Sequence, residues 1–136
     1  MMENDLTVSG CSDVSVSAGL NRIILYVRDV DISASFYAFF FGFRAVTTPT
    51  DRITELVPAS GGVHLMLHKA GKAQKMGQVA VKLVFDVADV AAFREEAAEK
   101  GLKFGAIHKA DGYAFSNAKD PDRNAIQISS RAFKSV

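Results

Sequence analysis

The sequence predicts an α+β fold built from two tandem βαβββ modules whose strands form a curled mixed sheet. The first observation is an internal repeat, in which Val-Arg-Asp-Val at 27–30 returns as Val-Ala-Asp-Val at 87–90. The second is a matching repeat later in each module, where Leu-Met-Leu at 65–67 corresponds to Ile-Gln-Ile at 126–128. Patterns that return after nearly the same interval, 60 residues for the first and 61 for the second, indicate a repeated structural unit. A chain of 136 residues, 49% of them hydrophobic, has enough apolar side chains to form the core of such a domain.

Module one is predicted to cover residues 20–69. It opens with an apolar strand that is rich in β-branched residues, followed by Asp29 and Asp31, which suit the start of a helix. The aromatic helix carries phenylalanines four residues apart and is expected to end at Gly42. The predicted elements are the strand 21–27, the helix 32–41 and the strands 43–48, 52–58 and 63–69.

Module two is predicted to cover residues 79–131, after a polar linker over 70–78. Asp89 stands where a helix cap belongs, and the alanine-rich helix that follows is expected to bury Val90, Phe93 and Ala97 on one face. The predicted elements are the strand 79–87, the helix 90–101 and the strands 103–109, 112–118 and 124–130, with a turn at 119–124.

Composition and charge exclude several classes of function. The formal net charge of +1 gives no field that favours nucleic acid, and no apolar run is long enough to span a membrane. Residues 1–19 are predicted to form a polar extension, which contains the single cysteine, Cys11. Without cysteine pairs or clusters, a reducing, cytoplasmic location is the simplest expectation.

Two stretches carry a resemblance to a known family. "YVRDVDISASFYAFFFGF" at 26–43 and "KDPDRNAIQI" at 119–128, together with the tandem modules, resemble the vicinal oxygen chelate superfamily. That superfamily includes glyoxalases, extradiol dioxygenases and bleomycin-resistance proteins. The resemblance implies that the paired modules form a cup that holds a small ligand, with pairing either within one chain or across a dimer. Because each module is expected to expose an edge strand, a homodimer is favoured.

The resemblance also implies where a metal would be held. Catalytic members place ligands on the first and fourth strands of each module, and these positions correspond to Arg22, Met66, Lys82 and Gln127. Only Gln127 suits a hard divalent ion. A divalent ion about 5 Å from a fixed positive charge, at an effective dielectric of about 20, is repelled by roughly 6–7 kcal/mol. We therefore expect no metal centre of the usual kind and no cofactor.

Strand alternation predicts which side chains line the cup. Arg22 and Tyr26 share one face of the first strand, and His64, Met66 and His68 share one face of the fourth. The candidate ligand-binding residues are therefore Arg22, Tyr26, His64, Met66, His68, Lys82 and Gln127. An alternative is that the two histidines are surface polar residues and that Arg22 and Lys82 pair with Glu55 or Asp86.

The leading hypothesis is a protein that binds a small anionic organic molecule in the cup without the usual metal. An alternative is a lyase or dioxygenase of the glyoxalase type that depends on zinc, nickel or manganese. Its metal would be held by a shifted set such as His64, His68 and Gln127, with Glu55 as candidate base. A third possibility is a scaffold whose dimer interface is the functional surface.

Overall fold

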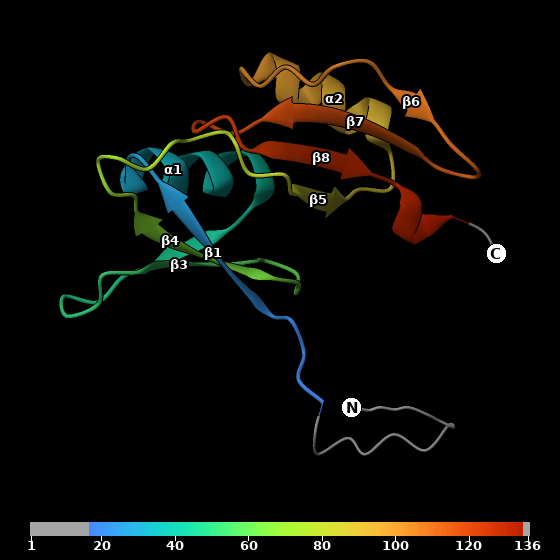
Figure 1. Cartoon of the computed structure of the whole chain (residues 1–136). Helices are drawn as coiled ribbons and strands as arrows, with labels where there is room; N and C mark the ends of the chain where they lie inside the picture. Colours follow the sequence, from blue (N-terminus) through green and yellow to red (C-terminus); the bar gives the residue numbers. More distant parts are fainter. Residues whose placement is uncertain (1–16, 135–136) are drawn as a thin grey trace.

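The computed structural model describes residues 17–134, and the predicted extension lies mostly outside this range, as does Cys11. Each module forms its own four-stranded mixed sheet with one helix across it (Figure 1). The elements are β1 (Arg22–Val27), α1 (Val30–Phe41), β2 (Arg44–Val46), β3 (Thr54–Val57), β4 (His64–Lys69), β5 (Lys82–Asp86), α2 (Val90–Glu99), β6 (His108–Lys109), β7 (Ala114–Lys119), β8 (Ala125–Ser129) and the 3-10 helix η2 (Arg131–Phe133). The predicted fold class is confirmed.

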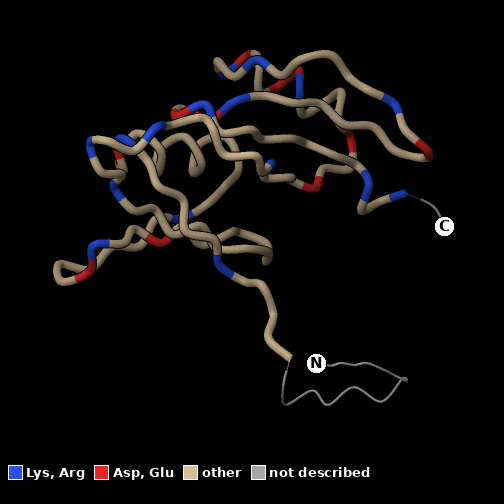
Figure 2. Tube along the Cα trace, viewed as in Figure 1, with Lys and Arg blue, Asp and Glu red and all other residues tan. Residues whose placement is uncertain are grey.

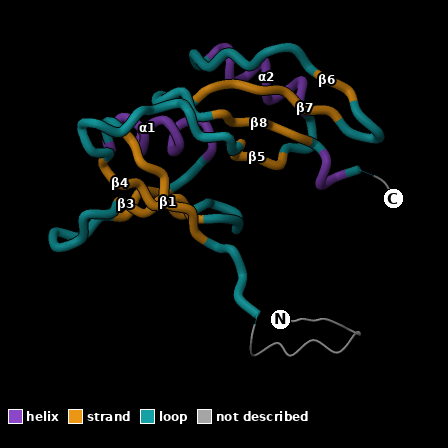
Figure 3. The backbone as a smooth tube through the Cα atoms, in the orientation of Figure 1, coloured by secondary structure: helices purple, strands orange, loops and turns teal. Residues whose placement is uncertain are grey.

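The two sheets repeat one topology. Their strand orders are β1-β4-β3-β2 and β5-β8-β7-β6, so the first strand of each module lies at an edge and pairs in parallel with the fourth. In the register, Arg22 pairs with His64 and Lys82 pairs with Ala125. Positions in module one can therefore be matched to positions in module two strand by strand. Figure 3 shows the loop segment that connects the two sheets.

Both helices begin at the aspartate caps that their sequences suggest, whereas α2 ends at Glu99, two residues before its predicted end at residue 101. The Asp29 carboxylate accepts a hydrogen bond from the Ile32 backbone N–H, and Asp89 accepts one from Ala92 in the same way. Helix α1 starts at Val30, two residues before the predicted start, and ends at Gly42. The φ of Gly42 is +77°, a left-handed conformation that residues with a Cβ rarely adopt.

The strands are shorter than predicted, and one prediction is largely wrong. Of the strand predicted over 103–109, only His108 and Lys109 form a regular ladder with β7, and Gly105 adds a single backbone hydrogen bond to the Asn117 carbonyl. The reason lies at Gly105, whose carbonyl oxygen accepts hydrogen bonds from Arg94 Nε and from the Ser116 hydroxyl. These side chains occupy the acceptor that a regular ladder would use, so the segment before His108 runs as a loop.

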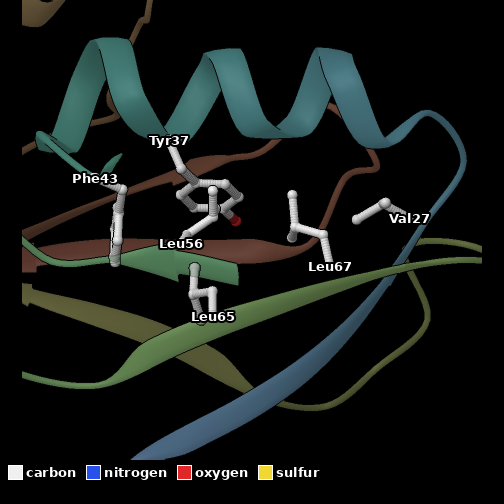
Figure 4. Packing of buried hydrophobic residues seen from close by; sticks show 6 residues of the cluster. All are labelled: Val27, Tyr37, Phe43, Leu56, Leu65 and Leu67. Carbon is white, nitrogen blue, oxygen red and sulfur yellow. The ribbon is translucent and has the colours of Figure 1, made fainter. Parts of the chain in front are cut away.

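The aromatic helix α1 joins the two modules. One side of it packs on the first sheet, where Tyr37 lies among buried residues that include Leu56, Leu65 and Leu67 (Figure 4). The other side meets module two, where the Phe41 ring stacks on Phe85 with centroids 3.9 Å apart. Phe41 also contacts Phe93 of α2, so the two cores share one aromatic layer.

A buried turn of module two also reaches module one. Asp120, between β7 and β8, accepts a 2.6 Å hydrogen bond from the Tyr37 hydroxyl. Asp122 accepts hydrogen bonds from the Arg28 backbone N–H and from the Ser33 hydroxyl. Asp120 further accepts from the backbone N–H groups of Asp122 and Asn124. Both carboxylates are thus satisfied, as buried charges must be.

Charged side chains of both signs are spread along the described chain (Figure 2). Among residues 17–134, no helix is both long enough and apolar enough to cross a bilayer.

Candidate functional site

Each sheet has one face covered by its helix and one open face, which we call the concave face. On β1, Ile23, Leu25 and Val27 are more buried than Arg22, Ile24 and Tyr26, which lie on the concave face. On β4, Leu65 and Leu67 are buried against the helix, so His64, Met66 and His68 lie on the concave face. The alternation predicted from the sequence places these side chains correctly.

A hydrogen-bonded set of three side chains lies on the concave face of module one. The Glu55 Oε2 atom accepts from His64 Nδ1 at 2.7 Å and from Arg22 Nε at 3.3 Å. The hydrogen bond from His64, with the charge of Arg22 as a further cause, holds the pKa of Glu55 below its usual value. Glu55 is therefore an ionised carboxylate at neutral pH, and it offsets the charge of Arg22.

The other end of the same face carries an aromatic pair. The rings of Tyr26 and His68 lie 5.3 Å apart, and His68 Nδ1 is 2.9 Å from the Lys69 carbonyl oxygen. Met66 lies between His64 and His68 along β4 and pairs in register with Ile24. This face therefore combines an apolar and aromatic half with an ionised half.

Module two carries a set without a carboxylate at the matching positions. Asn117 Oδ1 accepts from Gln127 Nε2 at 2.9 Å and from Lys82 Nζ at 3.3 Å. Among the described residues, Lys82 has no carboxylate partner within ion-pair distance, and it contacts Asn117 rather than Asp86. The alternative pairing expected from the sequence thus holds for Arg22 with Glu55 but not for Lys82 with Asp86.

The predicted site residues therefore form separate groups in the structure. Arg22 and His64 meet through Glu55, Tyr26 meets His68, and Lys82 meets Gln127 through Asn117. A hollow of about 250 Å³ lies between β1 and the segment that leads into β5. Of the seven predicted residues, only Tyr26 lines it. Its other lining residues are mainly apolar and include Ile24, Met76, Val79 and Val81. A larger depression of about 460 Å³ lies beside α2, away from the concave faces.

The residues present do not fit a divalent metal. Arg22 and Lys82 are cationic, and arginine does not lose its proton in proteins. His64 and His68 are four residues apart on one strand, which separates their Cα atoms by about 13 Å. Gln127 lies on the other sheet, so the shifted set does not converge on one ion. Across residues 17–134, no cluster of three or more His, Cys, Asp or Glu side chains is arranged to hold a metal.

Sequence reasoning missed the partners that organise these groups. Asn117 was not among the predicted site residues, and Glu55 was considered only as an ion-pair partner or a base. The registers pair Glu55 with Met66 and Asn117 with Gln127, so the two are equivalent positions on the third strand of each module. Extending the internal repeat from the first and fourth strands to the third would have found both.

The chain belongs to the Glyoxalase/Bleomycin resistance protein/Dioxygenase superfamily, whose family model matches residues 19–128. No curated protein matches the chain.

Several solved structures share the fold at low sequence identity. UcmS2 is 20% identical with a TM-score of 0.71, over 85% of this chain and 99% of that one. TnmS3, an antibiotic binding protein from Streptomyces sp. CB03234, is 19% identical with a TM-score of 0.70, over 83% and 95% of the two chains. The oxidase ChaP-H2 is 21% identical with a TM-score of 0.68, over 85% and 95%. At these identities, the similarity establishes the fold alone.

Proposed function

We propose that this protein binds a small, anionic organic molecule on its concave faces, without the metal centre usual in catalytic members of the superfamily. The observation that carries the proposal is the chemistry of the four positions that hold metal in those members. Here they are Arg22, Met66, Lys82 and Gln127, and their side chains lie on the concave faces. Two cations and a thioether favour an organic ligand over a divalent ion.

The preference for an anion rests mainly on Lys82. The charge of Arg22 is offset by Glu55 at 3.3 Å, whereas Lys82 contacts only the neutral amide of Asn117 among the described residues. An ammonium group beside an amide pair suits a carboxylate. Ile24, Tyr26 and Val84 are exposed on the concave faces and provide apolar surface for the body of the ligand.

The comparisons support binding as a role that this fold can perform. TnmS3 is described as an antibiotic binding protein, and ChaP-H2 is described as an oxidase. The fold therefore accommodates both binding and catalysis, and the side chains must decide between them. For this chain, the cationic side chains at the usual metal positions favour ligand binding without a metal over metal-dependent catalysis.

The proposal includes a homodimer in the cytoplasm. Both β1 and β5 are edge strands with exposed apolar side chains beside them, including Ile24, Val79, Val81 and Val84. A second copy would cover these edges and bring additional concave-face residues to the ligand. Light scattering at micromolar concentration is the direct test, and a monomer would contradict the dimer.

The ligand preference can be tested with matched pairs of small aryl carboxylates and their neutral amides. Isothermal titration calorimetry would compare the wild-type protein with Lys82→Gln and with Lys103→Gln, an exposed lysine of module two outside the concave face. We expect Lys82→Gln to weaken carboxylate binding by about 1.5–3 kcal/mol while leaving the amide unaffected. Equal weakening of both ligands, or no weakening, would contradict the anion preference.

The metal-dependent alternative needs its own experiment. The purified protein would be dialysed, reloaded separately with nickel, zinc and manganese, and analysed for bound metal. We expect no stoichiometric retention. Retention that survives dialysis would contradict the metal-free proposal and would direct attention to lyase and dioxygenase substrates.

A further inference from the structure

His64 has a fixed proton position that is set by its partner. An ionised carboxylate can only accept hydrogen bonds, so the 2.7 Å contact with Glu55 requires His64 Nδ1 to carry a proton. In the neutral imidazole, the other nitrogen, Nε2, then keeps its lone pair. His64 lies on the concave face, with 27% of its side chain exposed. A base is therefore present on the surface proposed to receive a ligand.

Arg22 contributes to keeping Glu55 ionised, after the larger effect of the hydrogen bond from His64. Its Nε atom donates to the same oxygen that His64 contacts, and the charge of Arg22 is one of the causes that lower the pKa of Glu55. Arg22 from β1 and Glu55 from β3 are the charged side chains that face His64. Glu55 thus remains anionic and can stabilise an imidazolium without taking its proton.

Module two shows that the fold does not require this arrangement. Its register places Ala125 at the position of His64, and Asn117 at the position of Glu55. The same four-stranded sheet therefore forms with neither a histidine nor a carboxylate at these positions. Forming the His64–Glu55 pair in module one requires ordering two side chains and partly desolvating a charge, and the sheet can form without either.

We propose that His64 is a metal-free general base that removes a proton from a bound carbon acid. In this step the C–H bond breaks, the proton moves to Nε2, and the electron pair remains on the substrate as an oxyanion conjugated to the carbon. The imidazolium is stabilised by Glu55, and return of the proton completes an isomerisation without any oxidant or co-reactant. Glu55 acts as a positioning residue.

The surroundings of His64 define the class of substrate. The Arg22 guanidinium uses Nε for Glu55, so its terminal N–H groups can donate to an oxygen that gains negative charge. Met66 and Ile24 lie beside the set and pair with each other in register, which offers an apolar wall. A compound with an acidic C–H next to a carbonyl or similar electron acceptor fits both features. The inference does not depend on the anion preference of Lys82.

The first test measures the proton position in the unmodified protein. Nitrogen-15 NMR of the imidazole rings distinguishes the two neutral tautomers, and His64→Gln assigns the signal. We expect His64 to carry its proton on Nδ1 at neutral pH. A proton on Nε2 would overturn the proposal, because that nitrogen could not then act as the base. This test requires no ligand, and its wild-type result stands even if a variant folds poorly.

The second test uses a nitrobenzisoxazole as a general probe of base catalysis. A base removes its ring proton, the N–O bond breaks, and the coloured cyanonitrophenolate forms. Removal of a positioned base typically costs about 100-fold or more, so we expect His64→Gln to lose at least about tenfold of the rate. His108→Gln, which changes an exposed histidine of module two, is the control and should retain the wild-type rate. An unchanged rate in a folded His64→Gln protein would overturn the proposal.

The role of Glu55 has a signature that loss of structure would not produce. Removing the carboxylate removes the acceptor that places the proton on Nδ1, so in Glu55→Ala part of the His64 population should carry its proton on Nε2 in the nitrogen-15 spectrum. A proton that stays wholly on Nδ1 in this variant would contradict the positioning role. These outcomes are independent of carboxylate binding at Lys82, so failure of the base site and failure of the proposed function can be told apart.

Discussion

The two modules share one strand register but place their ionisable side chains in different regions. In module one, these side chains gather on the concave face, where Glu55 holds Arg22 and His64. In module two, the concave face carries Lys82 beside the neutral pair Asn117 and Gln127, and the buried carboxylates occupy the turn before β8 instead. The matching turn of module one, residues 59–62, is exposed and has no carboxylate. The concave faces thus carry the groups proposed to meet a ligand, whereas the turn before β8 carries the carboxylates that join the two modules.

The largest expected effect comes from breaking the joining turn. Asp120→Ala would leave the Tyr37 hydroxyl and the N–H groups of Asp122 and Asn124 without their acceptor. We expect the free energy of unfolding to fall by about 3–5 kcal/mol, measured by urea denaturation. Ser60→Ala, in the matching turn of module one, should change it by less than about 0.5 kcal/mol. Similar losses from both variants would show that the two turns contribute equally to the free energy of unfolding.

The aromatic layer should give the next largest effect. Phe41→Ala removes a ring that contacts both Phe85 and Phe93, and we expect a loss of about 2–3 kcal/mol because the residue is only partly buried. Phe39→Ala, on the same helix but 59% exposed, is the matched control and should cost less than about 1 kcal/mol. An equal loss from Phe39→Ala in the same denaturation experiment would mean that the layer between the modules has no special weight, because alanine is the better helix former and helix propensity cannot explain a loss.

A smaller loss of stability is expected from removing the hydroxyl oxygen of Tyr37, which lies where the two modules meet. Burial, and then the nearby charge of Asp120, raise the pKa of Tyr37 above its ordinary value, so its hydroxyl remains a proton donor. Tyr37→Phe should therefore lower the free energy of unfolding by about 1.5 kcal/mol. Tyr26→Phe, on the half-exposed concave face, should leave the thermal midpoint unchanged. A neutral Tyr37→Phe would mean that water replaces the hydroxyl.

The smallest effect concerns pH. The pKa of Glu55 is lower in the folded protein than in the unfolded chain. Its interactions therefore stabilise the fold at pH values above the pKa that Glu55 has in the unfolded chain. That contribution is lost as pH falls through the folded pKa. The difference in stability between wild type and Glu55→Gln should therefore be larger at neutral pH than in acid. Glu95→Gln, on the exposed side of α2, should show no such dependence in the same pH series.

The sequence predicted the fold from local signals that tertiary contacts later reinforced. Asp29, Asp89 and Gly42 act within one helical turn, so their roles can be inferred from the chain alone. The segment before His108 was mispredicted because its strand-like composition competes with side-chain donors that reach Gly105 from α2 and β7. Composition does not reveal such distant donors.

The candidate site was predictable only in part for a related reason. Period two placed Arg22, Tyr26 and the β4 side chains on the correct face. It could not show that Glu55 offsets Arg22 or that Asn117 joins Lys82 to Gln127, because these contacts depend on the pairing of the third strand. Register across strands, rather than alternation along them, decides which polar groups meet.

The turn at Asp120 also bears on the order in which the chain can fold during synthesis. Tyr37 is separated from Asp120 by 83 residues, and the Arg28 backbone is separated from Asp122 by 94. When module one leaves the ribosome, the acceptor for its buried hydroxyl has not yet been translated. The first helix can therefore reach its final packing only after the last hairpin arrives, which delays commitment to the native state until nearly the whole chain is available.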